Sequence, residues 1–203
     1  GSYFDTIFDY SIYYDKRNSP YQPTSGFKSN WVQSLPIISD GPSIINGYDI
    51  TGYKEIIDDM VFSAGIYGRA ITAMSDKDVR VSKRLFLPRT KLRGFESGKV
   101  GPKDGNDFIG GNYITTFNTS TTVPYVLQTL ENVDLKLFFD MANVWGVDYS
   151  SAIDDSNKIR SSFGAAVEIL TPVGPLSFSL AQPITKNSGD VTETFRFQLG
   201  TTF

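Results

Sequence analysis

The sequence predicts an all-β fold, and specifically an antiparallel transmembrane β-barrel, from three observations. Apolar and polar residues alternate over long segments, these segments are long enough to cross a bilayer, and aromatic residues gather at their ends. No apolar run approaches the roughly 20 residues that a membrane-spanning helix needs. The mean hydropathy of −0.19 does not argue against a barrel, because lipid-facing apolar residues alternate with polar residues of the lumen.

The first half of the chain shows the alternation most clearly at its beginning. Phe8, Tyr10 and Ile12 fall on one face of an extended segment, whereas Asp9 and Ser11 fall on the opposite face. Turn residues then separate the segments, at Pro20 to Gly26, at Asp40-Gly41-Pro42 and at Asp58-Asp59. In this half we expect strands over residues 4–16, 26–38, 46–57 and 60–73.

The second half of the chain repeats the pattern. Leu135, Leu137 and Phe139 oppose Lys136 and Asp140. Three later segments alternate in the same way, from Phe163 to Ile169, from Leu176 to Leu180 and from Phe195 to Phe203. The turns between them are Pro172-Val173-Gly174-Pro175 and Asn187-Ser188-Gly189-Asp190. Here we expect strands over residues 112–125, 133–146, 160–171, 175–184 and 192–203, which brings the number to about nine.

A soluble β-sandwich is the competing architecture, because its strands also alternate apolar and polar residues. In this chain isolated charges such as Asp9, Lys136 and Glu168 stand at mid-strand positions, opposite a face rich in aromatic residues. Strands of about 9–13 residues exceed the usual 5–6 of soluble sheets and suit a tilted crossing of the bilayer. Aromatic residues at strand ends, such as Trp145, fit an interfacial girdle. The pattern therefore favours the membrane barrel.

The composition excludes several classes of function. Cysteine and histidine are both absent, so disulfides, thiolate metal sites and Ser-His-Asp triads cannot form. The net charge of −3 gives no reason to expect a nucleic acid as partner. We therefore expect a protein that is not an enzyme, with no cofactor and no bound metal.

One connection, residues 74–111, is too long for an ordinary hairpin loop, and it contains Leu92, Arg93, Gly94 and Phe95. This tetrapeptide resembles the (Val/Ile/Leu)-Arg-Gly-(Phe/Tyr) signature of the BamA family, the bacterial surface antigen superfamily of outer-membrane insertases. In that family the motif lies at the tip of a long extracellular loop that folds back into the barrel lumen. The resemblance implies the same position for the signature loop here.

Further segments resemble the family in the same order along the chain. They are Gly110-Gly111-Asn112, Phe139 to Trp145, Pro172 to Leu176, Ala181-Gln182-Pro183 and the closing segment Phe195 to Phe203. The family's barrel has sixteen strands preceded by periplasmic domains, and the strands predicted here correspond to its last nine. The resemblance thus implies one truncated barrel domain over residues 1–203 without periplasmic domains, in which Gly1-Ser2 looks like a cloning scar.

Two positions depart from the family pattern. Pro88-Arg89 stands where the family usually has a pair of glycines shortly before the signature. The segment Asn118 to Thr121 lacks the acidic residue that the family tends to place on the strand after the loop. At this second position the chain therefore offers no carboxylate to the signature arginine.

The resemblance implies that the planar guanidinium of Arg93 binds a lumen carboxylate through two parallel hydrogen bonds. Asp140 is the expected partner of Arg93, because it points to the lumen by strand parity and matches the family's position. The alternative is a solvated loop arginine.

Nine of the 19 basic residues lie in residues 76–112, where they either contact lipopolysaccharide phosphates or offset lumen carboxylates. They are Lys77, Arg80, Lys83, Arg84, Arg89, Lys91, Arg93, Lys99 and Lys103.

The last strand carries an apolar row that resembles the family's C-terminal assembly signal: Phe195, Phe197, Leu199 and Phe203. Any last strand that faces lipid would show the same alternation, so an assembly signal and a purely structural origin of this row are compatible. In the family this strand pairs weakly with the first strand and leaves a lateral seam. An open strand edge is a template for another chain's strand, so an incoming barrel can add its strands there.

The resemblance implies an assembly factor that inserts unfolded β-barrel proteins into the bacterial outer membrane. Its expected partners are these substrates, outer-membrane lipids and lipopolysaccharide, and periplasmic assembly lipoproteins for a full-length parent. A translocation or secretion barrel of the same superfamily and a passive structural barrel or pore are the alternatives. The signature loop favours assembly over a passive pore, because a plain pore does not need it.

Closure of the barrel poses a physical difficulty. Nine antiparallel strands cannot close in the usual way, because the first and last would run parallel. Each unpaired backbone group of an edge facing lipid costs several kcal/mol. We therefore expect unusual closure, a segment left out of the barrel, or edges paired with a second copy, and we predict self-association or an engineered truncation.

Overall fold

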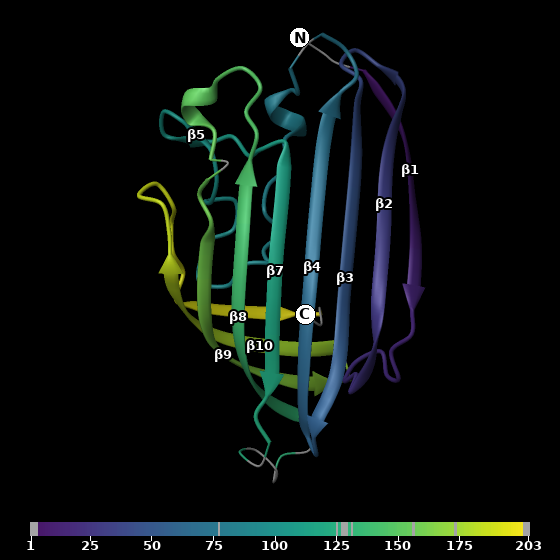
Figure 1. Cartoon of the computed structure of the whole chain (residues 1–203), viewed down its shortest axis with the longest axis vertical. Coiled ribbons are helices and arrows are strands. Elements are labelled where there is room, and N and C mark those ends of the chain that lie inside the picture. Colours follow the sequence, from purple (N-terminus) through teal and green to yellow (C-terminus); the bar gives the residue numbers. More distant parts are fainter. Residues whose placement is uncertain are drawn as a thin grey trace.

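The computed structural model describes residues 4–200 apart from residues 77, 125, 127–129, 131, 156 and 173. Nine long strands form one antiparallel sheet in the order β1-β2-β3-β4-β7-β8-β9-β10-β11, so that successive long strands are neighbours (Figure 1). Their bounds are β1 Asp5–Asp15, β2 Ser25–Ser39, β3 Ser43–Ile57, β4 Met60–Ala73, β7 Tyr113–Thr122, β8 Val133–Trp145, β9 Arg160–Thr171, β10 Gly174–Thr185 and β11 Phe195–Leu199. The strands predicted from the alternation are confirmed, and their ends differ by a few residues.

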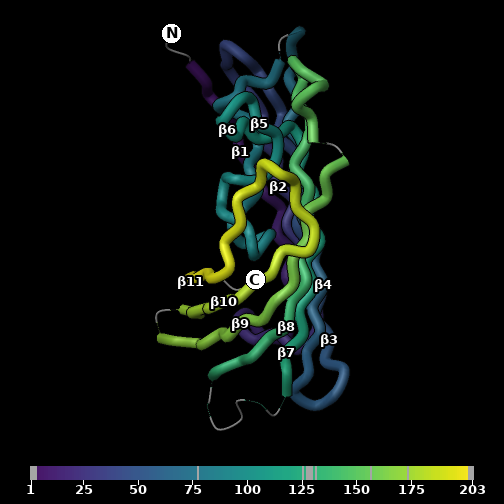
Figure 2. The backbone as a smooth tube through the Cα atoms, turned by 90° about the vertical axis from the view of Figure 1, so that its left-hand side faces the viewer, coloured from purple at the N-terminus to yellow at the C-terminus, as the bar shows by residue number. Residues whose placement is uncertain are grey.

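The sheet curves around an interior, as Figures 1 and 2 show, and its two edge strands are β1 and β11. Among the described residues, β1 pairs with β2 alone and β11 pairs with β10 alone. Within the described residues the two edge strands are thus not paired with each other, and the sheet is open between β1 and β11. Self-association remains a prediction.

The outward face of the sheet is apolar along its whole width. Phe8, Phe163 and Leu180 are each more than half exposed, although they lie on three different strands. The register keeps such residues on one face, as where Ile66 of β4 stands opposite Phe117 of β7. An apolar band on the outside of a curved antiparallel sheet is the surface that a lipid-facing barrel requires.

The connection between β4 and β7 lies on the concave side of the sheet, beside the β10–β11 connection (Figure 2). It contains one 3-10 turn, η1 (Val81–Lys83), and a two-stranded hairpin of β5 (Lys103–Asp104) and β6 (Asp107–Phe108). Its apolar residues form the main buried cluster together with the inner faces of β7 and β8: Leu87, Leu92, Phe95, Val100, Ile114, Ala142 and Val144. The loop therefore fills the interior of this part of the sheet, as predicted.

The β8–β9 connection holds a second 3-10 turn, η2 (Ser151–Ile153). Within the described residues, no helix has the length and apolarity needed to cross a membrane.

Candidate functional site

The signature residues occupy the innermost turn of the long loop. Gly94 has a backbone φ of +90°, a left-handed conformation that L side chains rarely adopt. A Cβ atom on Gly94 would also lie 3.2 Å from the Cβ atoms of Ala181 and Ser162, on strands β10 and β9. Glycine is required here both by the turn and by the close approach of the loop to the sheet.

Arg93 and Asp140 form a buried bidentate ion pair. The Arg93 Nε donates to Asp140 Oδ2 at 2.7 Å, and Nη2 donates to Oδ1 at 2.8 Å. The Arg93 backbone N–H adds a third bond to Oδ2 at 3.1 Å. The side chains are 4% and 0% exposed, so both charges are removed from water and depend on each other. The structure thus brings together the two residues that the sequence analysis paired.

Neighbouring groups complete the surroundings of this ion pair. The Asn118 side-chain amide donates to Asp140 Oδ1 at 2.8 Å and to the Lys91 carbonyl at 2.9 Å. The ring of Phe138 lies 3.5 Å from the Arg93 guanidinium carbon, a cation–π contact. Asn118 was missed by the sequence analysis, which noted only that no carboxylate stands there. An amide at this position serves as a donor to the shared Asp140, so a second carboxylate is not needed.

Arg196 is a second buried arginine of the site, and the sequence analysis did not assign it a role. It stands on the inward face of β11, and its guanidinium donates to the carbonyls of Arg89, Leu92 and Phe95. Its Nε and Nη2 also bind Glu193 Oε2, at 3.0 and 2.9 Å. Arg196 therefore holds the backbone of the signature loop from the last strand. Its signal in the sequence was a lone charge at an inward position between two phenylalanines.

Backbone pairing adds to this contact between the loop and the β10–β11 connection. Phe95 and Thr192 form an isolated antiparallel β-bridge. The N–H of Glu96 donates to the Val191 carbonyl at 2.9 Å, and the N–H of Glu193 donates to the Gly94 carbonyl at 3.0 Å. The signature loop is thus joined to the start of the last strand by main-chain bonds as well as by Arg196.

A further set of charges orders the loops at the same end of the sheet. Arg160 is fully buried and binds Asp190 at 2.9 Å and Asp155 at 2.5 Å, which ties the β8–β9 and β10–β11 connections together. Arg84 binds Asp148 at 2.5 Å. Burial alone would raise the pKa of Asp148, but hydrogen bonds from the Val79 N–H and from Asn112, with the Arg84 charge, hold that pKa below its ordinary value. Asp148 therefore stays ionised at neutral pH.

The basic residues of the loop are mostly paired. Within the described part of 76–112, the basic residues in ion pairs are Arg80, Lys83, Arg84, Lys91 and Arg93. Lys99 and Lys103 lie over the ring of Phe108, and Lys77 lies outside the described residues. This arrangement favours the interpretation that the loop charges offset carboxylates.

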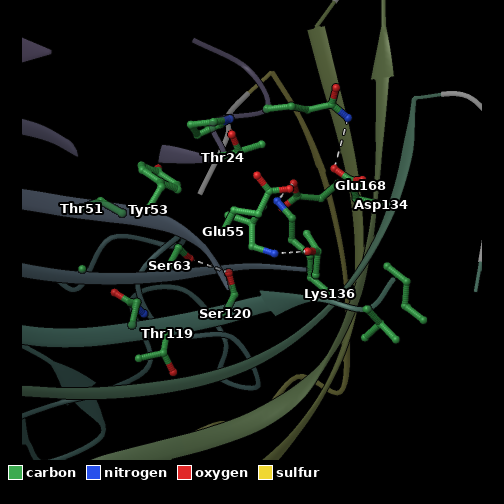
Figure 3. Close-up of a pocket in the computed structure, with 18 of the residues that line it drawn as sticks. Thr24, Thr51, Tyr53, Glu55, Ser63, Thr119, Ser120, Asp134, Lys136 and Glu168 are labelled. Carbon is green, nitrogen blue, oxygen red and sulfur yellow. Dashed lines mark hydrogen bonds and ion pairs between the residues drawn. The ribbon is translucent and has the colours of Figure 1, made fainter. Parts of the chain in front are cut away.

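A polar cavity of about 950 Å³ lies between the signature loop, which contributes Lys91 and Arg93 to its lining, and the β3–β4 and β7–β8 turns. Figure 3 shows part of its lining. Charges of both signs line it: Lys136 pairs with Glu168, and Lys91 pairs with Asp49 at 2.6 Å. Hydroxyl groups line another part, where Ser63 and Ser120 are hydrogen bonded at 2.8 Å. In the described chain no cluster of three or more acidic, histidine or cysteine side chains could hold a metal ion. The cavity is a polar part of the lumen, in which charges of opposite sign and hydroxyl groups are paired with each other.

The apolar row of the last strand faces outward. Phe195, Phe197 and Leu199 are 54%, 45% and 56% exposed, and Phe197 stacks beside Phe178 of β10 with ring centroids 5.2 Å apart. Phe203, the terminal residue of the predicted signal, lies outside the described residues.

Comparison with known proteins gives concordant matches. A family model described as the Omp85 superfamily domain matches residues 1–203. "Outer membrane protein assembly factor BamA" of Neorickettsia risticii (strain Illinois) is 26% identical over 199 residues, which cover 96% of this chain and 27% of that protein. The protein of the same name from Neisseria meningitidis serogroup B is 34% identical over 139 residues, which cover 55% and 17%. The human "Sorting and assembly machinery component 50 homolog" is 24% identical over 204 residues, which cover 93% and 44%.

A solved structure shows the same fold. The crystal structure of BamA from Haemophilus ducreyi lacking POTRA domains 1–3 matches with a TM-score of 0.84 and 28% identity, over 94% of this chain and 41% of that one. The chain therefore spans less than half the length of each of these proteins.

Proposed function

Because this chain belongs to the Omp85 superfamily, we propose that it forms the C-terminal part of the barrel of an outer-membrane protein assembly factor. It belongs to the bacterial outer membrane. Its substrates are unfolded β-barrel proteins, which it helps to insert and fold. The proposed activity makes and breaks no covalent bond, so the protein acts without being an enzyme.

The observation that supports this proposal is the edge of β11 that no strand among the described residues pairs with, beside the buried signature loop. β10 has 12 residues, but β11 has five, and no strand among the described residues pairs with its other edge. An unpaired strand edge is a template on which another chain can add a strand by main-chain hydrogen bonding. Arg196 and the backbone bonds to the loop hold this strand in place.

Lipids and accessory proteins complete the proposed surroundings. The exposed apolar face supports contact with outer-membrane lipids. Contact with lipopolysaccharide phosphates is supported by the number of basic residues in the loop, but the ion pairs they form leave fewer charges for it. Periplasmic assembly lipoproteins are proposed for a full-length parent on the resemblance alone.

The proposal is tested by the folding rate of a model outer-membrane protein in liposomes. The rate is measured in liposomes that contain this chain and in empty liposomes of the same lipid, with heat-dependent gel mobility as the readout. We expect faster folding when the chain is present. An unchanged rate, with chain shown by circular dichroism to be folded, would contradict the proposal.

The variant Lys99→Ala serves as the matched control in this assay. The Lys99 ammonium lies over the ring of Phe108, and the substitution removes one positive charge from the same loop while it leaves the backbone bond from Val191 to the Lys99 carbonyl in place. We expect Lys99→Ala to accelerate folding as much as the unmodified chain does.

A further inference from the structure

The outer edge of β11 can be assigned from its hydrogen bonds to β10. The N–H of Ala181 donates to the Thr194 carbonyl, and the N–H of Gly200 donates to the Pro175 carbonyl, both at 2.8 Å. Backbone groups of successive residues in a strand point to opposite sides, so the even-numbered residues of β11 face β10. The backbone groups of Phe195, Phe197 and Leu199 face away from β10, and they are called the seam edge below.

Within the part of the chain that the structure describes, a loop side chain and not a strand binds the middle of the seam edge. Nη2 of Arg89 donates to the Phe197 carbonyl at 3.3 Å. Arg89 precedes the signature residues Leu92 and Arg93 in the same loop. The guanidinium thus takes the acceptor that the N–H of an added strand would use.

The same two segments are also joined in the opposite direction. The buried guanidinium of Arg196, on the inward face of β11, donates to the backbone carbonyl of Arg89. The Arg89 backbone therefore accepts a hydrogen bond from Arg196, and the Arg89 side chain donates one to the next residue of the strand, Phe197. This pair of contacts keeps the Arg89 guanidinium at the seam edge although Arg89 itself belongs to a loop.

We propose that Arg89 is a cap on the seam edge, which occupies the Phe197 carbonyl until an incoming β-strand replaces it. This inference rests on the proposed function, because it concerns the edge at which substrate strands would add.

The contact is suited to a cap that can be displaced. It is a charge-assisted bond, but it is exposed and at the long end of hydrogen-bond distances. A strand that adds along the edge offers N–H groups to the Phe195, Phe197 and Leu199 carbonyls together. Several main-chain bonds then replace a single side-chain bond, so a strand of matching register displaces Arg89 and a short or mismatched peptide does not.

Binding of a strand peptide to the full chain in detergent micelles tests this inference. The probe is a fluorescently labelled synthetic peptide with the sequence of residues 192–203, which has the alternation of an outer-membrane strand. Its affinity is measured by fluorescence anisotropy for the unmodified chain, Arg89→Ala, Arg89→Met, Arg89→Lys and the control Lys99→Ala.

We expect Arg89→Ala and Arg89→Met to bind the peptide about threefold more tightly, because no side chain must be displaced from Phe197. Arg89→Lys keeps a donor and should bind as the unmodified chain does, as should Lys99→Ala. Arg89→Met retains the apolar stem of the side chain, so it tests the bond itself if Arg89→Ala fails to fold. Equal affinity of the unmodified chain and both uncapped variants would overturn the inference, and so would the absence of binding to any of them.

The liposome folding assay separates this inference from the proposed function. If the chain accelerates folding but the Arg89 variants bind the peptide like the unmodified chain, assembly activity stands and the cap is wrong. If the variants bind more tightly but the chain accelerates nothing, the cap stands and the proposed function is wrong.

Discussion

The two halves of the sheet share the same alternation but enclose different interiors. Strands β7 to β11 face the signature loop, and the buried hydrophobic side chains of the described residues all lie at or after Ile71. Strands β2 and β3 line the polar cavity with groups such as Lys28, Asp49 and Tyr53, and the parts of β7, β8 and β9 that the signature loop does not cover line it as well. An inward position therefore becomes part of a core only where the loop covers it.

Two ion pairs that the loop makes show this difference directly. Arg93 reaches Asp140 on β8, and the two side chains are 4% and 0% exposed. Lys91 reaches Asp49 on β3, and these side chains are 22% and 27% exposed. Both pairs have short bonds, at 2.7 and 2.6 Å, so distance alone does not rank them. Because Arg93 and Asp140 are buried, loss of either charge leaves the other unpaired and out of contact with water. Lys91 and Asp49 are partly exposed to the cavity, so loss of either charge costs less.

The largest expected effect comes from breaking the buried pair. Arg93→Ala leaves the Asp140 carboxylate buried without its main partner, and we expect a loss of about 3–5 kcal/mol in the free energy of unfolding. The measurement is urea unfolding in lipid vesicles, followed by tryptophan fluorescence. The Arg93 backbone N–H bond survives this substitution, which favours the lower end of the range.

A double-mutant cycle with Asp140→Ala provides the control for this prediction. We expect the double variant to lose much less than the sum of the two single variants, because it leaves no buried charge unpaired. If the loss of stability in the double variant equals the sum of the losses in the two single variants, the two side chains act independently and the clamp does not exist.

A smaller effect is expected from the turn that brings the loop to the sheet. Gly94→Ala places a Cβ 3.2 Å from Ala181 and Ser162 at a φ of +90°, and we expect a loss of about 1–3 kcal/mol. Gly52→Ala is a suitable control, because a Cβ there meets no atom within 4 Å and the residue belongs to β3. An equal loss from both variants in urea unfolding would mean that the loop turn has no special requirement for glycine.

The strands and their inward parity could be predicted from the sequence, because both follow from a repeat of two residues. The parity of β8 placed Asp140 in the lumen, and the motif resemblance placed Arg93 opposite it. Parity does not reveal what occupies the interior, however. Asp49 and Asp140 are both single carboxylates within predicted strands, so the sequence does not show which of them is buried. The path of the loop buries Asp140 and leaves Asp49 partly exposed.

The parts of the site that the sequence did not reveal depend on backbone carbonyls. Arg196 and Arg89 bind main-chain acceptors of the loop and of the last strand, which every residue carries, so no residue type marks these contacts in the sequence, although Arg196 also pairs with Glu193. Asn118 was missed for a related reason, because an amide that donates to a shared carboxylate differs from the expected acid. Side-chain pairs of opposite charge leave a sequence signal, and side-chain bonds to the backbone do not.

The smallest expected effect is on the pair that faces the cavity. Lys91→Ala removes the bond to Asp49 but leaves that carboxylate in contact with water, so we expect a loss of about 0.2–1 kcal/mol in urea unfolding. Salt should reduce the difference between Lys91→Ala and the unmodified chain, because partly exposed charges are screened. The Arg93→Ala difference should persist at the same salt concentration. A Lys91→Ala loss as large as that of Arg93→Ala would show that the cavity is as dry as the loop-filled interior, and the contrast between the two halves would then fail.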